Sequence, residues 1–418
     1  MARLIYTLAV FAAMPWALLH LIWRSRRQPE YLRHWHERFG RYGTRPDGPL
    51  IWIHAVSVGE TRAAQPLVAA LREHHGDHRI LFTHMTPTGR QTSTDLYGDE
   101  VTRAYLPYDM PWATRRFLEH FQPTLGLIME TELWPNLVAH CHNRRIPLLL
   151  VNARLSARSA GRYARVPGLT RTTLRGLAAI AAQGEDDAER LRRLGAGEVA
   201  VLGNMKFDVD PPPAQIVLGS EFRARIGARK VFLCASTREG EEAVILDAWL
   251  RMGDSAVLLA IVPRHPQRFD QVAALIAARG LAMQRRSDDA PVAAETRVWL
   301  GDSMGEMFAY YTASDAAFIG GSLLDYGSQN LIEPCALGVP VLIGPSTRNF
   351  AEAASAALEH NAAIAIASAE ELVDEALALI ADPTRCAAKS KAATAFTSRH
   401  RGATARTLAL IERHLPQE

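Results

Sequence analysis

The stretch LIWIHAVSVGET (residues 50–61) decides how the rest of the chain is interpreted, because it joins three patterns in sequence. The apolar run Leu50–Ile53 is typical of a buried strand, a short glycine-containing turn follows, and a helical pattern covers Thr61–His75. In parallel α/β sheets, ligands bind outside the carboxyl ends of the strands. Glu60, in this turn, is therefore either a charge that favours a helix N-terminus or a catalytic base.

Apolar runs and helical patterns alternate from Leu50 onward in both halves of the chain. This alternation is typical of parallel sheets covered by helices. The halves are separated by DVDPPPAQ (residues 208–215), whose three consecutive prolines interrupt regular structure. The predicted fold class is α/β, with two facing Rossmann-like domains and a cleft between them. We expect an N-terminal domain over 24–207, a proline-rich hinge over 208–215 and a C-terminal domain over 216–418 that includes the C-terminal helices.

Length and composition agree with two ordinary globular domains. The chain has 418 residues, more than one hydrophobic core usually serves. A net charge of +3 is too small to indicate nucleic-acid binding, and no nucleic-acid partner is expected. The four cysteines are far apart in apolar or helical contexts, which favours buried thiols in a reducing compartment over disulfides or a metal site.

The N-terminal segment Leu4–Trp23 has the length and apolar character of a membrane-spanning helix. His20 and Pro15 weaken this pattern, so a helix lying in the interface is an alternative, and a buried helix of a soluble domain is another. The following segment, Arg24–Arg41, has six arginines and two glutamates. By the positive-inside rule, such a basic collar places the rest of the chain in the cytoplasm. We expect residues 1–23 to be an N-terminal anchor.

A glycine-rich stretch, FIGGSLLDYGSQNLIEP (residues 318–334), dominates the second half. It predicts a strand that ends in Gly320 and Gly321, then a loop, then a helix that begins near Asn330. Glycines let a ligand approach the backbone, and helix N-termini attract anions, so this stretch predicts a phosphate cradle. The alternative is a glycine turn with an ordinary helix cap. Two other predicted strand ends, at Arg264 and at Ser303–Glu306, belong to the same sheet edge.

Nine motifs support a resemblance to a known family. In chain order they are HAVSVGE, MTPTG, METELWPN, NARLSARS, GNMKFD, PRHPQRF, GGS, NLIEP and GPSTRNFAE. Together they resemble bacterial 3-deoxy-D-manno-octulosonic acid (Kdo) transferases, glycosyltransferases of the GT-B type, from the N-terminal segment to about Glu352. The resemblance implies transfer of Kdo from CMP-Kdo to a lipid A precursor, with inversion, at the cytoplasmic face of the inner membrane. It implies no metal and no cofactor, and an anionic membrane surface as a partner.

The resemblance also assigns roles to residues. Glu60 would be the base, Glu130 would assist the transition state, and Lys206 would neutralise the donor. The CMP-sugar site would consist of Pro263, Arg264, Met304, Gly305, Glu306, Asn330, Leu331, Ile332 and Glu333. The chain departs from the family pattern at Gln329, where the family often has histidine, and at Leu331, where it often has proline.

Two further clusters of charged or polar residues each have two interpretations. Arg154, Arg158, Arg162 and Arg165 recur at spacings of three and four, which would place them on one helical face. They are either phosphate contacts for the acceptor or a solvated helix face. The run REHHGDH (residues 72–78) resembles a metal cluster, but it lacks a cysteine or a Glu-x-x-His pattern, so a solvated polar turn is favoured.

Two other functions are alternatives to Kdo transfer. A nucleotide-sugar 2-epimerase can share the predicted fold, but it needs no apolar anchor with a basic collar. A non-catalytic membrane scaffold would not need to keep Glu60, Glu130, Lys206 and Arg264.

Overall fold

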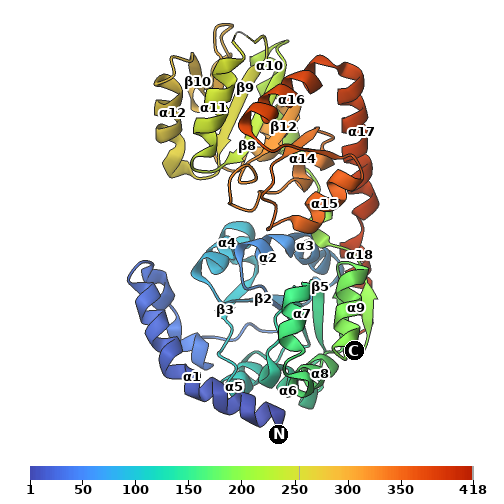
Figure 1. Cartoon of the computed structure of the whole chain (residues 1–418). Coiled ribbons are helices and arrows are strands. Elements are labelled where there is room, and N and C mark those ends of the chain that lie inside the picture. Colours follow the sequence, from blue (N-terminus) through green and yellow to red (C-terminus); the bar gives the residue numbers. More distant parts are fainter. Residues whose placement is uncertain (254, 417–418) are drawn as a thin grey trace. The chain divides into compact units, whose positions relative to one another are not determined.

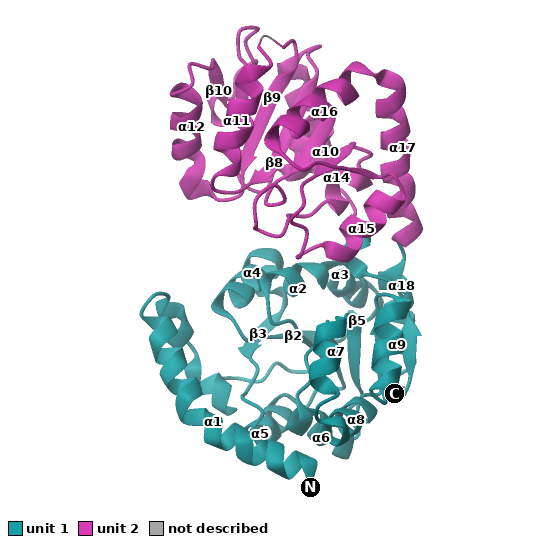
Figure 2. Cartoon of the chain, in the orientation of Figure 1, with its two compact units in different colours: residues 1–208, 401–418 teal, residues 209–400 magenta. Residues whose placement is uncertain are grey.

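The structure, a computed structural model of the chain, describes residues 1–253 and 255–416. Helices and strands alternate along most of its length (Figure 1). The chain divides into two compact units (Figure 2). Unit 1 consists of Met1–Asp208 and Arg401–Glu418, and unit 2 consists of Val209–His400.

Unit 1 is built on a seven-stranded sheet in the order β3-β2-β1-β4-β5-β6-β7, with parallel pairing throughout. Its strands are largely buried apolar runs, as expected for a parallel sheet covered on both faces. The order reverses between β1 and β4, which makes their carboxyl ends a topological switch point. The strands are β1 (Leu50–His54), β2 (Arg79–His84), β3 (Thr102–Tyr105), β4 (Leu125–Met129), β5 (Leu148–Ala153), β6 (Ala179–Ala182) and β7 (Val199–Val201).

The helices of unit 1 begin at ordinary start signals. Ser57, Thr86 and Ser156 each accept a backbone N–H at a helix N-terminus, and prolines occupy the first turn of several others. The α-helices are α1 (Ala2–Ser25), α2 (Val58–Ala63), α3 (Gln65–His74), α4 (Pro87–Tyr97), α5 (Pro111–Phe121), α6 (Pro135–Asn143), α7 (Ala157–Tyr163), α8 (Pro167–Arg175), α9 (Glu185–Arg193) and α18 (Ala403–Glu412). The 3-10 turns are η1 (Pro29–Leu32), η2 (Trp35–Phe39), η3 (Gly98–Glu100) and η4 (Met205–Phe207).

Helix α1 is the one helix in the described part of the chain that is long and apolar enough to cross a membrane. Only 6% of its most apolar stretch is buried. One point of attachment to unit 1 is Thr7, whose Oγ1 donates to Asn136 Oδ1 at 3.1 Å. The large apolar side chains that α1 exposes are Leu4, Ile5, Leu8, Phe11, Trp16, Leu19, Ile22 and Trp23.

Unit 2 is built on a second seven-stranded sheet, in the order β10-β11-β9-β8-β12-β13-β14, again parallel. Here the order reverses between β8 and β12. The strands are β8 (Val231–Thr237), β9 (Leu258–Pro263), β10 (Met283–Arg285), β11 (Val298–Leu300), β12 (Ala316–Ile319), β13 (Val341–Ile343) and β14 (Ala363–Ala365). The helices are α10 (Pro213–Ile226), α11 (Glu241–Arg251), α12 (Phe269–Ala277), α13 (Met307–Ala313), α14 (Ile332–Ala336), α15 (Ala351–Glu359), α16 (Ala369–Ala381) and α17 (Pro383–His400), with 3-10 turns η5 (Pro266–Arg268) and η6 (Arg286–Asp288).

The C-terminal boundary differs from the sequence interpretation, which assigned 216–418 to one domain. Residues 401–418 belong to unit 1. Helix α18 adds Ala403, Leu408, Leu410 and Ile411 to the apolar core beneath the unit 1 sheet. A helical pattern indicates that such a segment has an apolar face, but it does not indicate which of two similar cores will bury that face.

The proline-rich segment also differs in detail. Pro213 is the first residue of α10, a position where proline is favoured because its missing N–H would have no helical partner. At the other end of the segment, the Asp208 carboxylate accepts the backbone N–H groups of Gly402 (2.6 Å) and Thr404 (2.5 Å). One carboxylate therefore ties the place where the chain leaves unit 1 to the place where it returns.

Candidate active-site residues at the strand ends

Glu60 lies on α2, directly after β1. Its carboxylate accepts the backbone N–H of Val56 and, at 3.3 Å, that of Ser57, while Ser57 Oγ accepts the Glu60 N–H. This is a capping box. The interpretation of Glu60 as a helix N-terminal charge is confirmed, and Glu60 Oε1 accepts no hydrogen bond from the residues that the structure describes.

The same carboxyl group is unusually easy to protonate. Burial, followed by the negative charge of Glu130, raises the pKa of Glu60 to about 7, against the opposing effect of the Val56 and Ser57 N–H groups. The charge of Glu132 raises it further. A carboxyl with a pKa near neutrality can gain and lose a proton under physiological conditions, which is what general acid–base catalysis requires.

Glu130 follows β4, so it and Glu60 belong to the two strands that flank the switch point of unit 1. Its backbone has a φ of 56°, a left-handed conformation that is uncommon for glutamate. Glu130 Oε1 is 2.9 Å from Lys206 Nζ, and both side chains are 22% exposed. The structure therefore joins two of the three residues predicted to be catalytic in one partly buried ion pair.

A chain of amides supports this ion pair, and the sequence interpretation missed it. Asn152, with a φ of 52°, accepts the Met205 N–H through Oδ1, at 3.1 Å. Gln183 donates to the Asn152 carbonyl and accepts from Asn204 Nδ2, both at 2.9 Å. Asn204 in turn accepts the Lys206 N–H at 3.0 Å. The ends of β5, β6 and β7 thereby fix the turn that presents Lys206.

Glu132 is a third carboxyl in this region, two residues beyond Glu130. Burial raises its pKa to about 7. Its charge also acts on Tyr163, at the end of α7, whose pKa burial raises. Unit 1 thus places three glutamates close enough to affect one another, and Lys206 is paired with one of them, Glu130.

In unit 2, cations gather at the ends of β8 and β9. Arg238 Nη1 is 2.9 Å from His265 Nε2, and the guanidinium of Arg238 lies 4.8 Å from the Tyr326 ring centre. Burial, and then the charges of Arg238, Arg264 and Arg268, lower the pKa of His265. This clustering favours a bound anion. Arg264 was predicted here, whereas Arg238, which directly follows β8, was missed.

The predicted phosphate cradle is wrong in one respect, because a protein carboxylate already holds the glycine-rich loop. Glu241, at the start of α11, has no exposed surface. It accepts the N–H groups of Arg238 (2.9 Å), Gly321 (2.7 Å), Leu323 (3.0 Å) and Leu324 (3.4 Å). The glycines serve close packing instead, since a Cβ on Gly320 would lie 2.4 Å from the Ser236 carbonyl.

The segment 329–333 completes this edge of unit 2. Asn330 lies before α14, accepts the Ile332 N–H (2.9 Å) and donates to Glu333 Oε1 (3.0 Å). Gln329, which stands where the family often has histidine, accepts from Arg264 Nε at 3.3 Å. The side chains of Leu331 and Ile332 are buried, and the part that these two residues take in the donor site stays a prediction. Pro263, the last residue of β9, is also buried.

The turn after β11 contains the other predicted donor residues. Ser303 Oγ donates to Glu306 Oε2 (2.5 Å) and lies 2.7 Å from the Tyr310 hydroxyl. Glu306 is also paired with Arg286 at 3.1 Å. Met304 is 54% exposed, and Gly305 has a φ of 81°, a conformation suited to glycine. The turn is held in place from within and presents Met304 and the backbone of Gly305 to solvent.

Known proteins resemble this chain over its whole length. A family model described as 3-deoxy-D-manno-octulosonic-acid transferase matches residues 33–209. A 3-deoxy-D-manno-octulosonic acid transferase of Bordetella pertussis is 44% identical, over 99% of both chains. One of Haemophilus influenzae is 36% identical, also over 99% of both. The chain belongs to the Kdo transferase family. It is a glycosyltransferase, as the nine motifs predicted.

Solved structures show the fold of this transferase. A UDP-GlcNAc 2-epimerase of Neisseria meningitidis aligns with 87% of this chain and all of its own, with a TM-score of 0.58 and 16% identity. A glycosyltransferase of Rickettsia africae aligns with 89% of this chain and all of its own, with a TM-score of 0.57 and 13% identity. The GT-B fold class is confirmed. At these identities the likeness to an epimerase concerns the fold alone.

The arginines predicted as an acceptor site of the transferase do not share one helix. Helix α7 covers Ala157–Tyr163, so only Arg158 and Arg162 lie on it, and both are exposed. Arg154 precedes the helix and is half-buried, and Arg165 follows it. The predicted stripe of four is therefore wrong, because the helix is too short to carry it.

The basic collar is likewise not uniform. Five of its six arginines are exposed, whereas Arg38 is 2% exposed. Arg38 lies 4.1 Å from the Tyr105 ring centre and donates to the Met85 carbonyl at 3.1 Å. Arg38 is therefore part of the core of unit 1 and does not contribute to a basic surface.

Proposed function

We propose that this transferase moves Kdo from CMP-Kdo to a lipid A precursor, with inversion, and that Glu60 is its general base. The observation that carries the proposal is the Glu60 carboxyl, whose pKa of about 7 arises from burial and from the Glu130 charge at the switch point of unit 1. Its relatives of 44% and 36% identity bear the name of Kdo transferases. An acceptor hydroxyl needs such a base as it becomes a nucleophile.

In the proposed reaction, the acceptor oxygen forms a bond to the anomeric carbon of Kdo while the bond from that carbon to the CMP phosphate oxygen breaks. The hydroxyl proton passes to the Glu60 carboxylate. CMP leaves with the electron pair of the broken bond. Attack on the face opposite the leaving group inverts the anomeric carbon, and a single carboxylate base suffices for such a displacement.

Lys206 and Glu130 are proposed to act as a pair. The ion pair at 2.9 Å holds the ammonium group at the strand ends of unit 1, where it can offset the negative charge of the donor. Glu130 would then position this cation and, through its own charge, raise the pKa of Glu60. Both functions depend on the same carboxylate, so Glu130 is a positioning residue in this proposal.

Unit 2 is proposed to bind the CMP moiety. The cationic group of Arg238 and Arg264, beside a neutral His265, would bind the phosphate. The paired amide and carboxylate of Asn330 and Glu333 would accept and donate hydrogen bonds to sugar hydroxyls. The exposed Met304 and Gly305 would cover the base. None of these contacts requires a metal or a cofactor, so none is proposed.

The acceptor and the membrane are proposed to meet unit 1. The exposed Arg158 and Arg162 on α7 suit the phosphates of a glycolipid, and the exposed apolar face of α1 suits the inner membrane. Charge reversal of both arginines should raise the acceptor KM more than the donor KM, while Arg175→Glu on α8 serves as the control. Equal changes in both KM values would contradict the assignment.

Product mass tests the proposal as a whole. The purified full-length chain is incubated with CMP-Kdo and a lipid A precursor, and the lipid products are weighed by mass spectrometry. We expect the precursor mass plus one or more Kdo residues, with release of CMP. An unchanged lipid, with the donor intact, would overturn the proposal. Replacement of the donor by another CMP-sugar tests donor choice in the same assay.

A further inference from the structure

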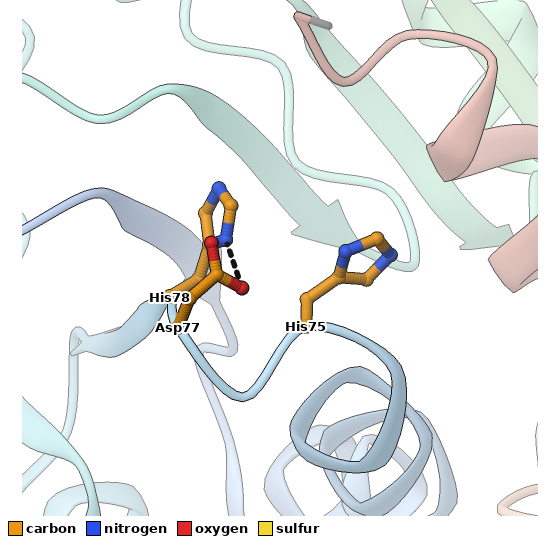
Figure 3. Close-up of side chains that lie close together, drawn as sticks. All are labelled: His75, Asp77 and His78. Carbon is orange, nitrogen blue, oxygen red and sulfur yellow. Dashed lines mark ion pairs between the residues drawn. The ribbon is translucent and has the colours of Figure 1, made fainter. Parts of the chain in front are cut away.

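The turn between α3 and β2 contains a cluster of metal-binding side chains that the proposed reaction does not use. His75, Asp77 and His78 lie on this turn, as Figure 3 shows, and their ligand atoms are all within 4.8 Å of one another. His78 Nδ1 is 3.1 Å from Asp77 Oδ1, and the two imidazole ring centres are 5.9 Å apart. The sequence alone favoured a solvated polar turn here.

The structure adds a contact to this cluster that the sequence could not show. Glu412, the last residue of α18, places its Oε1 3.5 Å from His75 Nε2 and 3.5 Å from His74 Nδ1. Glu412 is separated from His75 by most of the chain, but α18 packs on α3 within unit 1. Two imidazoles and one carboxylate thus form the cluster, and a second carboxylate, from α18, contacts the His75 imidazole. His75 Nε2 is closed to solvent and has no hydrogen-bond partner among the described residues.

We propose that His75, Asp77 and His78 bind a divalent transition metal, with Zn²⁺ as the best match, and that Glu412 supports the site through its contact with the His75 imidazole. Imidazole nitrogen and carboxylate oxygen are both common Zn²⁺ ligands, and three of them leave one position of a tetrahedral site for water. Bonds of about 2.0–2.2 Å bring ligand atoms to roughly 3.3–3.6 Å from one another. Rotation of side chains on this turn, where Asp77 is 62% exposed, closes the remaining gap.

The position of the site indicates what the metal would do. The turn precedes β2, so it lies at the amino edge of the sheet, whereas Glu60, Glu130 and Lys206 lie at the carboxyl edge. A metal here is remote from the catalytic carboxylates and serves stability. By holding His75, which contacts Glu412, it fastens α18 to the body of unit 1. Metal binding to the folded state alone then raises the melting temperature.

The test uses the full-length chain without a histidine tag, treated with a chelator and titrated with ZnCl₂ alone. We expect one Zn²⁺ per chain by calorimetry, a rise in Tm, and, with Co²⁺ in place of Zn²⁺, visible absorption of a tetrahedral ion. The double variant His75→Ala/His78→Ala should lose roughly tenfold or more in affinity. His142→Ala, an exposed histidine on α6, is the matched control and should bind as the parent does.

Glu412→Gln tests whether the contact between Glu412 and His75 contributes to metal binding, and it leaves the turn at residues 75–78 unchanged. We expect weaker Zn²⁺ binding and a smaller Zn²⁺-induced rise in Tm in this variant. Zn²⁺ binding that is equally tight in the parent and in the double variant would overturn the proposal. So would a parent chain that binds no Zn²⁺, or a Glu412→Gln variant whose affinity and Tm rise equal those of the parent.

Discussion

The two units place glutamates at the same edge of the same kind of sheet, half-buried in unit 1 and fully buried in unit 2, with opposite results. In unit 1, Glu60 accepts two backbone N–H groups of its own cap, and Glu132 is held by burial with a pKa of about 7. In unit 2, Glu241 accepts four backbone N–H groups, and Glu242 binds the Arg268 guanidinium through both oxygens, at 2.6 and 3.0 Å.

The two kinds of glutamate differ in how many lone pairs of the carboxylate oxygens already accept hydrogen bonds. A carboxylate that is saturated with donors is part of the scaffold, because moving a proton or a ligand to it would break several hydrogen bonds. Glu241 and Glu242 meet this description. A carboxylate that is desolvated but incompletely paired, such as Glu60, is held near the point of ionisation and can exchange a proton. Burial alone therefore does not distinguish a catalytic glutamate from a structural one.

The largest expected effect comes from Glu60→Gln. The amide keeps the shape and one acceptor oxygen for the cap but cannot accept a proton, so turnover should fall by about 10²–10⁴-fold. At pH 5, where Glu60 is mostly protonated, stability should change by at most roughly 1 kcal/mol, and at pH 8 the loss of a desolvated charge should not lower it. Turnover and Tm are measured on the same purified variant, with Glu73→Gln, an exposed residue of α3, as the control. Near-normal transfer by a stable Glu60→Gln protein would make Glu130 the next candidate base.

The ionisation of the Glu60 carboxyl also predicts how kcat/KM of the parent enzyme depends on pH. Glu60 acts as a base only when ionised, and its pKa is about 7. We expect kcat/KM to be constant above this pH and to fall about tenfold for each unit below it, so that pH 5 gives about 100-fold less than the plateau. CMP binding, measured over the same range, is the reference. A profile that is flat from pH 5 to 8 would contradict a base with a raised pKa.

The same substitution in unit 2 should act on stability. Glu241→Gln replaces one acceptor oxygen by an NH₂ group that faces backbone N–H donors, which should cost about 1–3 kcal/mol and lower the Tm. The loop at Gly321 would lose its anchor, so CMP binding should weaken as well. Glu239→Gln, an exposed neighbour, is the control. A Glu241→Gln protein as stable as the parent would show that saturation does not mark a structural carboxylate.

Glu132→Gln is expected to change stability by an amount similar to that of Glu241→Gln, but with the opposite sign. The raised pKa of about 7 means that the folded state binds the Glu132 proton more tightly than the unfolded state does. The associated stability is present at low pH and is lost as pH rises from about 4.5 to 7. The variant should therefore have a higher Tm than the parent at pH 8, by the equivalent of about 1–3 kcal/mol, and a similar Tm at pH 5.

The same variant tests whether the carboxylates of unit 1 are coupled. The Glu132 charge raises the pKa of Glu60, so its removal should move the midpoint of the rate profile below pH 7. A Tm difference that does not vary with pH, together with an unmoved midpoint, would indicate that Glu132 ionises independently at its ordinary pKa.

Much of the fold could be predicted because its signals are local. Apolar runs, capping residues and glycine turns mark the strand ends, and the strand ends of a parallel sheet share one edge. Glu60, Glu130, Lys206 and Arg264 were found in this way. Their roles came from the motif resemblance, and the ion pair between Glu130 and Lys206 needed the register of β4 and β7 across the sheet.

The remainder depended on contacts between distant residues. Glu241 occupies the N–H groups of Gly321 and Leu323, about eighty positions further along the chain, and no local pattern shows this. The positive φ of Asn152 depends on the bulge between β5 and β6, where the register shifts. Likewise, the length of α7 was set by its surroundings, so the periodic arginines beyond it were overinterpreted.

The return of the chain to unit 1 has a consequence for how the protein is made. During synthesis, residues 209–400 emerge from the ribosome as one continuous piece that can fold by itself, while unit 1 still lacks α18 and its four core residues. Unit 1 can therefore complete its core only after α18 has left the ribosome, which is after the whole of unit 2. A protein truncated by a premature stop codon near residue 400 would carry a finished unit 2 beside an open unit 1, and quality-control proteases would have a defined place to recognise it.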